Sequence, residues 1–196
     1  MNAPIPPLLR YGLWAWLFGA MGIGASGVLL RLPVPAIQGV LAMFTALGVI
    51  VWRRIASVRA WVAQADMRLF IALHLTRFVG IYLVYLYRRG LLPYDFAVRG
   101  GIGDTVVAIA ALALCVIPMA PVTRRSAIVF WNIFGLIDII LVVAAAAREG
   151  LVGNPQMRAL AVLPLSLLPT FLVPLIVVTH FILFSRVLAR DSGTAP

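Results

Sequence analysis

Residues 71–87 read "IALHLTRFVGIYLVYLY", a stretch that is apolar enough to lie in lipid and yet contains His74 and Arg77. A helix needs about 20 mostly apolar residues to cross the hydrocarbon core of a bilayer. This run has that length when it is extended back to Leu69, and two arginines follow it directly. The stretch therefore predicts a membrane-spanning helix with two ionisable side chains in its first half.

The rest of the chain is also strongly hydrophobic and has few charged residues. Of its 196 residues, 63% are hydrophobic and only 11% are charged, and the mean hydropathy is +1.07. Soluble domains have about 25% charged residues. We expect an all-α polytopic bundle of about six spans that forms a single transmembrane domain over residues 1–196. The predicted spans are Tyr11–Leu30, Leu32–Trp52, Leu69–Tyr87, Thr105–Thr123, Ser126–Ala147 and Ala159–Ser185.

The charge and the cysteine content exclude several classes of function. The net charge is +10, but the arginines lie in short segments between the spans and form no basic run with interleaved aromatic residues. This pattern indicates a lipid bilayer as the partner and argues against nucleic acid. The chain has no lysine, which excludes Schiff-base chemistry. Cys115 is the only cysteine, so no internal disulfide can form.

The distribution of arginines predicts an orientation. If the N-terminus is inside, the inner segments, which include Arg190, hold nine of the 16 basic residues and the outer segments hold six. Cytoplasmic loops are usually the richer in arginine. We therefore expect a multi-pass protein of the bacterial inner membrane with both termini in the cytoplasm. The first run is too long and too weakly preceded by charge for a typical cleaved signal peptide, so we expect it to be retained.

Two segments depart from simple spans. Residues 53–68 read "RRIASVRAWVAQADMR" and place Ile55, Val58 and Trp61 on one helical face, which predicts either an interfacial amphipathic segment or an extension of the second span. The last span has prolines at positions 164, 169 and 174. Because proline removes a backbone donor, we expect a kink there. Such breaks frame binding sites in some transporters and are plain packing kinks in other proteins.

Five polar residues inside the predicted spans form the candidate ligand-binding or ion-binding site. They are His74, Arg77, Asn132, Asp138 and His180. An ionisable side chain at the bilayer centre costs about 2.5–3.5 kcal/mol on insertion scales, so such residues usually face the interior and pair. His74 and Arg77 share a helix face. We expect Arg77 to pair with Asp138, and the pair either forms part of a site or fixes the helix register.

The two histidines suggest an alternative. His74 and His180 each lie six residues from an arginine, about 9 Å deep. A b-type haem needs two axial imidazoles inside a helical bundle, and this pair is a candidate for that role. Taken singly, each histidine is better explained as a hydrogen-bonded packing residue. No metal-ligand cluster, P-loop or serine elbow accompanies them.

Gly101-Ile102-Gly103-Asp104 resembles the GxGD signature of intramembrane aspartyl proteases, the presenilins and prepilin peptidases. That chemistry needs two carboxylates that share a proton. Tyr94-Asp95 echoes the partner motif of that family, but Asp95 precedes Asp104 on the same loop. We expect Asp104 to lie at the outer edge of its span and to cap the helix. No catalytic residue is assigned, and an enzyme is not the expected class.

Four stretches resemble a family of uncharacterised polytopic bacterial membrane proteins. They are residues 74–86, 91–108, 131–146 and 163–182. The resemblance implies a six-helix membrane protein and draws attention to a set of polar and small residues without assigning an activity. That set is His74, Arg77, Gly103, Asp104, Asn132, Asp138, Pro174 and His180.

The sequence leaves three functions open. The first is a membrane protein whose buried polar cluster binds or transports a small molecule or ion. The second is a haem-binding cytochrome, and the third is a non-catalytic subunit that binds a protein partner. No cofactor is assigned by the sequence.

Overall fold

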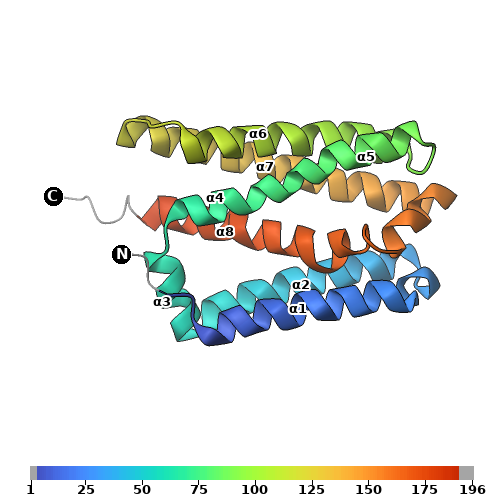
Figure 1. Cartoon of the computed structure of the whole chain (residues 1–196), viewed down its shortest axis with the longest axis horizontal. Helices are drawn as coiled ribbons and strands as arrows, with labels where there is room; N and C mark the ends of the chain where they lie inside the picture. The colour runs from blue at the N-terminus through green and yellow to red at the C-terminus, as the bar shows by residue number, and fades with distance from the viewer. Residues whose placement is uncertain (1–3, 190–196) are drawn as a thin grey trace.

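The computed structural model describes residues 4–189, and every regular element in that range is helical. Arg190, which we counted for the orientation, lies outside the described residues. The helices run roughly parallel to one long axis (Figure 1). Helix α8, Val173–Ala189, lies between a hairpin of α1 and α2 on one side and a group of helices α4 to α7 on the other.

The N-terminal hairpin consists of α1, Pro7–Ser26, and α2, Val34–Arg54. Gly27 ends α1 with a φ of 67°, a left-handed conformation that glycine adopts without steric cost. A 3₁₀ turn and a second proline-led helix start then reverse the chain. The indole N–H of Trp16 donates to the carbonyl of Thr170 at 2.8 Å, which ties the hairpin to the last span.

The segment after the hairpin forms a separate short helix, α3, Ala56–Gln64. Its inward face buries Val58, Trp61 and Val62, while Ser57 remains exposed. The helix therefore has one apolar and one polar face. Its position at a membrane interface stays a prediction.

The predicted third span is a continuous helical segment that changes its winding midway. It comprises α4, Met67–Leu73, a 3₁₀ segment, His74–Phe78, and α5, Val79–Arg88. Asp66 caps the start of α4 by accepting from the backbone N–H of Arg68 at 2.8 Å.

The fourth span begins earlier than the sequence suggested. A π-helical segment, Asp95–Gly100, leads without a break into α6, Gly101–Val116. Asp104 therefore lies well inside the span, and it makes no capping bond, because the N-cap position of α6 is Gly100. The expectation of an edge position for Asp104 was wrong.

The last two helices differ from their predicted bounds in opposite ways. Helix α7, Pro121–Leu151, is longer than its apolar run because its arginine-bearing ends remain helical. The predicted sixth run starts instead with a 3₁₀ segment, Pro155–Ala161, and turns, and then a π-helical segment, Leu168–Leu172, leads into α8. Proline provides no N–H to the ladder, which explains why regular α-helix begins only after Pro169.

Within the described range, five helices are long and apolar enough to cross a membrane. They are Ala36–Arg54, Met67–Arg88, Asp95–Val116, Pro121–Leu151 and Leu168–Leu188. Helix α1 is not among them, although its 20 residues have sufficient length. Arg10, four glycines and two tryptophans lower its hydropathy. The protein is a helical membrane protein, and a sixth span stays a prediction.

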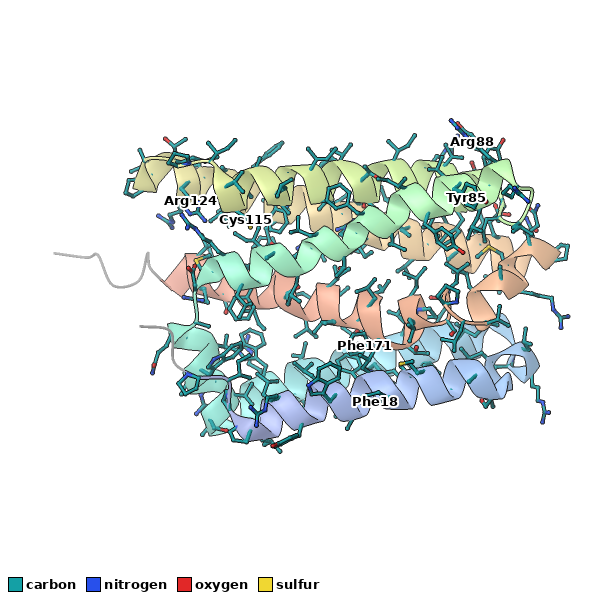
Figure 2. All side chains as sticks on the ribbon, viewed as in Figure 1. Phe18, Tyr85, Arg88, Cys115, Arg124 and Phe171 are labelled. Carbon is teal, nitrogen blue, oxygen red and sulfur yellow. The ribbon has the colours of Figure 1, made fainter. Side chains whose placement is uncertain are left out.

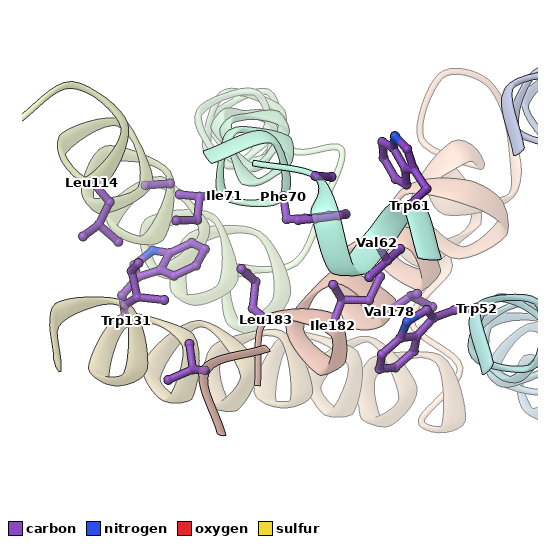
Figure 3. Packing of buried hydrophobic residues seen from close by; sticks show 14 of the residues in the cluster. Trp52, Trp61, Val62, Phe70, Ile71, Leu114, Trp131, Val178, Ile182 and Leu183 are labelled. Carbon is purple, nitrogen blue, oxygen red and sulfur yellow. The ribbon is translucent and has the colours of Figure 1, made fainter. Parts of the chain in front are cut away.

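Three apolar clusters fill the bundle, and the two largest lie toward its opposite ends. The larger lies toward the end where α8 finishes and includes Trp61, Phe70 and Trp131 (Figure 3). The smaller includes Leu83, Phe96 and Val142 toward the opposite end. Figure 2 shows arginine side chains at both ends, with Arg124 at one and Arg88 at the other. On α6 and α7 the buried polar residues lie between the two clusters, near mid-depth.

Candidate functional site

The centre of the site is Arg77, whose side chain is fully enclosed by protein. Its Nε–H donates to Oδ1 of Asp104 at 2.6 Å, and a second guanidinium N–H donates to the backbone carbonyl of Gly135 at 2.9 Å. The remaining terminal nitrogen pairs with the carboxylate of Asp138. One guanidinium thus holds two carboxylates from two different helices, Asp104 from α6 and Asp138 from α7.

The local backbone explains why these groups meet. In a 3₁₀ helix the side chains at positions i and i+3 eclipse one another, so His74 and Arg77 leave the segment in the same direction. Gly103 leaves the space that the Asp138 carboxylate occupies, because a Cβ at that position would overlap it. A Cβ at Gly135 would lie 2.9 Å from the His180 ring. Two glycines therefore make room for polar side chains of the site, the Asp138 carboxylate and the His180 ring.

A second polar group lies against the first and joins α7 to α8. The side-chain amide of Asn132 donates to the carbonyl of His180 at 3.1 Å, and its oxygen lies 2.7 Å from Nδ1 of the same histidine. An amide oxygen is an acceptor, so the proton of His180 lies on Nδ1. Nε2 of His180 then carries a bare lone pair, and this buried atom has no partner within the described residues.

His74 has the opposite tautomer by the same reasoning. Its Nε2 lies 3.1 Å from the hydroxyl of Thr179, and that hydroxyl donates its only proton to the carbonyl of Ile176 at 2.7 Å. The hydroxyl must therefore accept from Nε2–H of His74. Nδ1 of His74 is left as a second buried acceptor without a partner in the described part of the chain.

The two imidazole rings contact each other directly. Their centroids lie 4.5 Å apart with the planes at 70°, and the His74 ring also meets Trp131 edge to face at 4.8 Å. Bis-imidazole haem ligation needs a porphyrin plane between the two rings. Rings in edge-to-face contact leave no such layer, so His74 and His180 do not fit the haem hypothesis in this arrangement.

A cavity of about 60 Å³ reaches the charged group from the side of the smaller apolar cluster. Arg77 and Asp104 form part of its wall, Gln38 adds one amide, and the remaining wall is apolar, with Phe96 and Leu168 among it. A water needs about 10–15 Å³ of such volume, so the cavity has room for a small hydrated ion. Asp104 therefore lines a cavity that adjoins the charged group.

The arrangement corrects the interpretation of the GxGD-like stretch. Asp104 is neither a cap nor half of a proton-sharing dyad, because the guanidinium of Arg77 lies between it and Asp138. Asp95 is remote from this site and pairs with Arg99 and Arg148 at the helix ends. The two carboxylates that an aspartyl protease would use are thus both occupied by one arginine.

The structure brings all five candidate residues into one connected cluster. His74, Arg77, Asn132 and His180 are buried, and Asp138 is partly exposed, with 14% of its side chain accessible. The candidate list omitted two members, Asp104, to which only the family resemblance drew attention, and Thr179. A clue to Asp104 was available, since the five N–H donors of one arginine exceed what a single carboxylate can accept. Thr179 carried no signal, because a threonine in an apolar span is common.

Comparison with known proteins identifies the chain at the level of a domain. A model described as a domain of unknown function, DUF8737, matches residues 34–188. No curated protein and no solved structure matches the chain.

Proposed function

The chain belongs to the DUF8737 family, whose function is unknown, and from the geometry of the buried cluster we propose that it is a membrane carrier for a proton or a small monovalent cation. The cluster of Asp104, Arg77 and Asp138 is the proposed binding site. His74, His180 and Asn132 form its second half.

The observation that carries the proposal is a mismatch of charge. Two carboxylates share one guanidinium, so the ionised group has one negative charge in excess. An uncompensated charge is strongly disfavoured in a low-dielectric interior. A proton or a cation at Asp104 or Asp138 would remove the excess charge. A purely structural pair would need only one carboxylate.

The two histidines also favour a positively charged ligand. The hydrogen-bond network leaves Nδ1 of His74 and Nε2 of His180 as bare acceptors, and both are buried. A buried acceptor without a donor costs about 1–3 kcal/mol. A group that supplies a proton or positive charge would satisfy these nitrogens. Two lone pairs beside one excess negative charge therefore favour a cationic ligand over an anionic one.

The route from a cavity to the buried cluster supports transport of a ligand in addition to its binding. The cavity lined by Asp104 gives a ligand a route to the charged group from one side. A carrier needs a central site that can be reached from either side in turn.

The proposal includes a topology. We propose six crossings, with α1 as the sixth span, both termini in the cytoplasm and the protein in the inner membrane of a bacterium. The arginine distribution supports this orientation. The π-helical, proline-rich start of the last span is the proposed kink.

The test is ion flux in proteoliposomes. We expect the wild-type protein to dissipate an imposed pH or sodium gradient, read with an entrapped pH-sensitive or sodium-sensitive dye. Asp104→Asn and Asp138→Asn should each reduce the rate at least tenfold, because each removes the excess negative charge. Asp95→Asn is the matched control, since Asp95 lies at a helix end away from the cluster and should leave the rate unchanged.

The thermal midpoint of each variant separates a carrier from a structural cluster. If Asp104→Asn and Asp138→Asn fold normally and all proteins leave both gradients intact, the carrier proposal fails. If either change unfolds the protein and Arg77→Met together with both Asp→Asn changes restores folding, the cluster is structural. Stoichiometric copurification with another membrane protein, with no flux, would instead favour the partner-binding subunit.

A further inference from the structure

A second, larger cavity lies between the α1–α2 hairpin and helices α3, α4 and α8. Its volume is about 490 Å³, within the range of about 300–1,000 Å³ that is typical of ligand pockets. Its wall is almost entirely apolar and includes Leu13, Trp16, Phe44, Phe70 and Val178. A cavity with such a wall can hold a hydrocarbon chain, but it provides almost no hydrogen-bonding partners for a polar molecule.

The rim of this cavity at the α3 end is basic. Leu9, Trp52, Val58 and Leu69 line the cavity, and an arginine adjoins each of them in the sequence. These arginines are Arg10, Arg53, Arg59 and Arg68, and Arg54 lies beside Arg53. All five are exposed, and within residues 4–189 none of them has a carboxylate partner. The site therefore combines an apolar cavity with a rim of arginines that have no carboxylate partner within the described residues.

Two contacts hold part of this rim in place. The guanidinium of Arg59 donates to the carbonyl of Arg53 at 2.9 Å, which ties α3 back to the end of α2. The guanidinium of Arg53 lies 4.6 Å from the centre of the Trp52 ring, whose other side is buried in the core. The nearest acidic residue in the sequence, Asp66, faces the backbone N–H of Arg68 as a helix cap.

The opposite end of the bundle is neutralised differently. There Asp95 pairs with Arg99 and Arg148, and Glu149 pairs with Arg148 as well. Acidic side chains of the protein itself thus pair with Arg99 and Arg148 at that end, whereas Arg88 and Arg89 have no carboxylate partner within the described residues. The rim at α3 has no such compensation within the described residues, so an anionic ligand would supply its counter-charge.

We propose that the α3-end cavity is a specific site for an anionic phospholipid. One acyl chain lies between the α1–α2 hairpin and α8, and the phosphate lies against Arg53, Arg54 and Arg59. Basic pockets between membrane helices bind anionic lipid headgroups. This site does not depend on the proposed ion carriage.

The first test uses delipidated protein and two lipids with identical acyl chains, phosphatidylglycerol and phosphatidylcholine. We expect phosphatidylglycerol to bind at least tenfold more tightly in native mass spectrometry and to raise the thermal midpoint. The triple change Arg53→Gln, Arg54→Gln and Arg59→Gln should remove this preference. Arg88→Gln with Arg89→Gln, at the opposite end, is the matched control and should preserve it. Equal binding of the two lipids by wild type, or equal loss in the control, overturns the proposal.

The second test fills the cavity. Gly12 lines it and has open space where a Cβ would stand, whereas Gly19 on the same helix has equally open space but does not line it. We expect Gly12→Trp to weaken phosphatidylglycerol binding at least tenfold and Gly19→Trp to leave it unchanged. Unchanged binding in a folded Gly12→Trp protein would place the lipid on another surface and overturn the proposal.

Discussion

Arg77 uses three of its nitrogens on three acceptors, and the last of these acceptors fits only because Gly103 has no side chain. Arg77 thus attracts the carboxylate of Asp138, and Gly103 leaves the space that this carboxylate occupies. The geometry at this position is sensitive to a single methyl group. Alanine is normally the better helix former, so any loss of stability must come from the contact.

We predict that Gly103→Ala lowers the free energy of unfolding by about 1–3 kcal/mol, because the new methyl group displaces the Asp138 carboxylate from Arg77. The measurement is reversible unfolding in detergent. In an Asp138→Ala background the same change should cost almost nothing, since the contact is gone. A cost of equal size in both backgrounds would show that Gly103 matters for another reason.

At the scale of the elements, α5 and α6 approach each other through backbone. A Cβ at Gly80 would overlap the carbonyl of Gly101, and a Cβ at Gly101 would lie 2.5 Å from the carbonyl of Gly80. Small residues permit such close crossings, which are common where membrane helices associate. This crossing brings the chain of Arg77 within reach of Asp104.

We predict that Gly80→Ala lowers the thermal midpoint and weakens the α5–α6 contact, at a cost of about 1–3 kcal/mol, because a backbone carbonyl cannot rotate aside. Gly22→Ala is the control, since open space surrounds that position, and it should stabilise α1 by about 0.5–1 kcal/mol. Differential scanning of both variants gives the comparison. Shifts of the same sign in both would argue against a close crossing.

The elements also show what the sequence can predict. The apolar runs located the third and fifth spans well, because arginines flank these runs and a segment inside the hydrocarbon core must be mostly apolar. The fourth span was placed about ten residues too late, since we treated Asp104 as a boundary. Charge marks a boundary only when it is unpaired, and the partner of Asp104 lies 27 positions earlier. The tautomers of His74 and His180 depend on Thr179 and Asn132, which no linear pattern connects.

At the scale of the whole molecule, the number of crossings determines which side each loop faces. The end of α1 and the start of α2 meet at one end of the bundle, while α3 lies at the other (Figure 1). If α1 crosses the bilayer, residues before it lie on the same side as α3. If it does not cross, they lie on the side of the α1–α2 turn.

Single cysteines in a Cys115→Ala background test this arrangement. Ile5, Leu30 and Ser57 are exposed positions before α1, between α1 and α2, and in α3. With a membrane-impermeant maleimide, we expect Leu30→Cys to be labelled in intact cells, and Ile5→Cys and Ser57→Cys only in inverted vesicles. Labelling of Ile5→Cys together with Leu30→Cys would leave five crossings, and a complete reversal would place the termini outside.

The 3₁₀ segment at His74–Phe78 has a consequence for the phase of the third span. Each residue turns about 20° further than in an α-helix and rises about 0.5 Å more, so five residues advance α5 by about 100° and about 2.5 Å. That offset sets which face of α5 meets α6. Rewinding the segment to α geometry would turn Gly80 away from Gly101. The winding of this short segment and the packing of α5 against α6 therefore cannot change independently of each other.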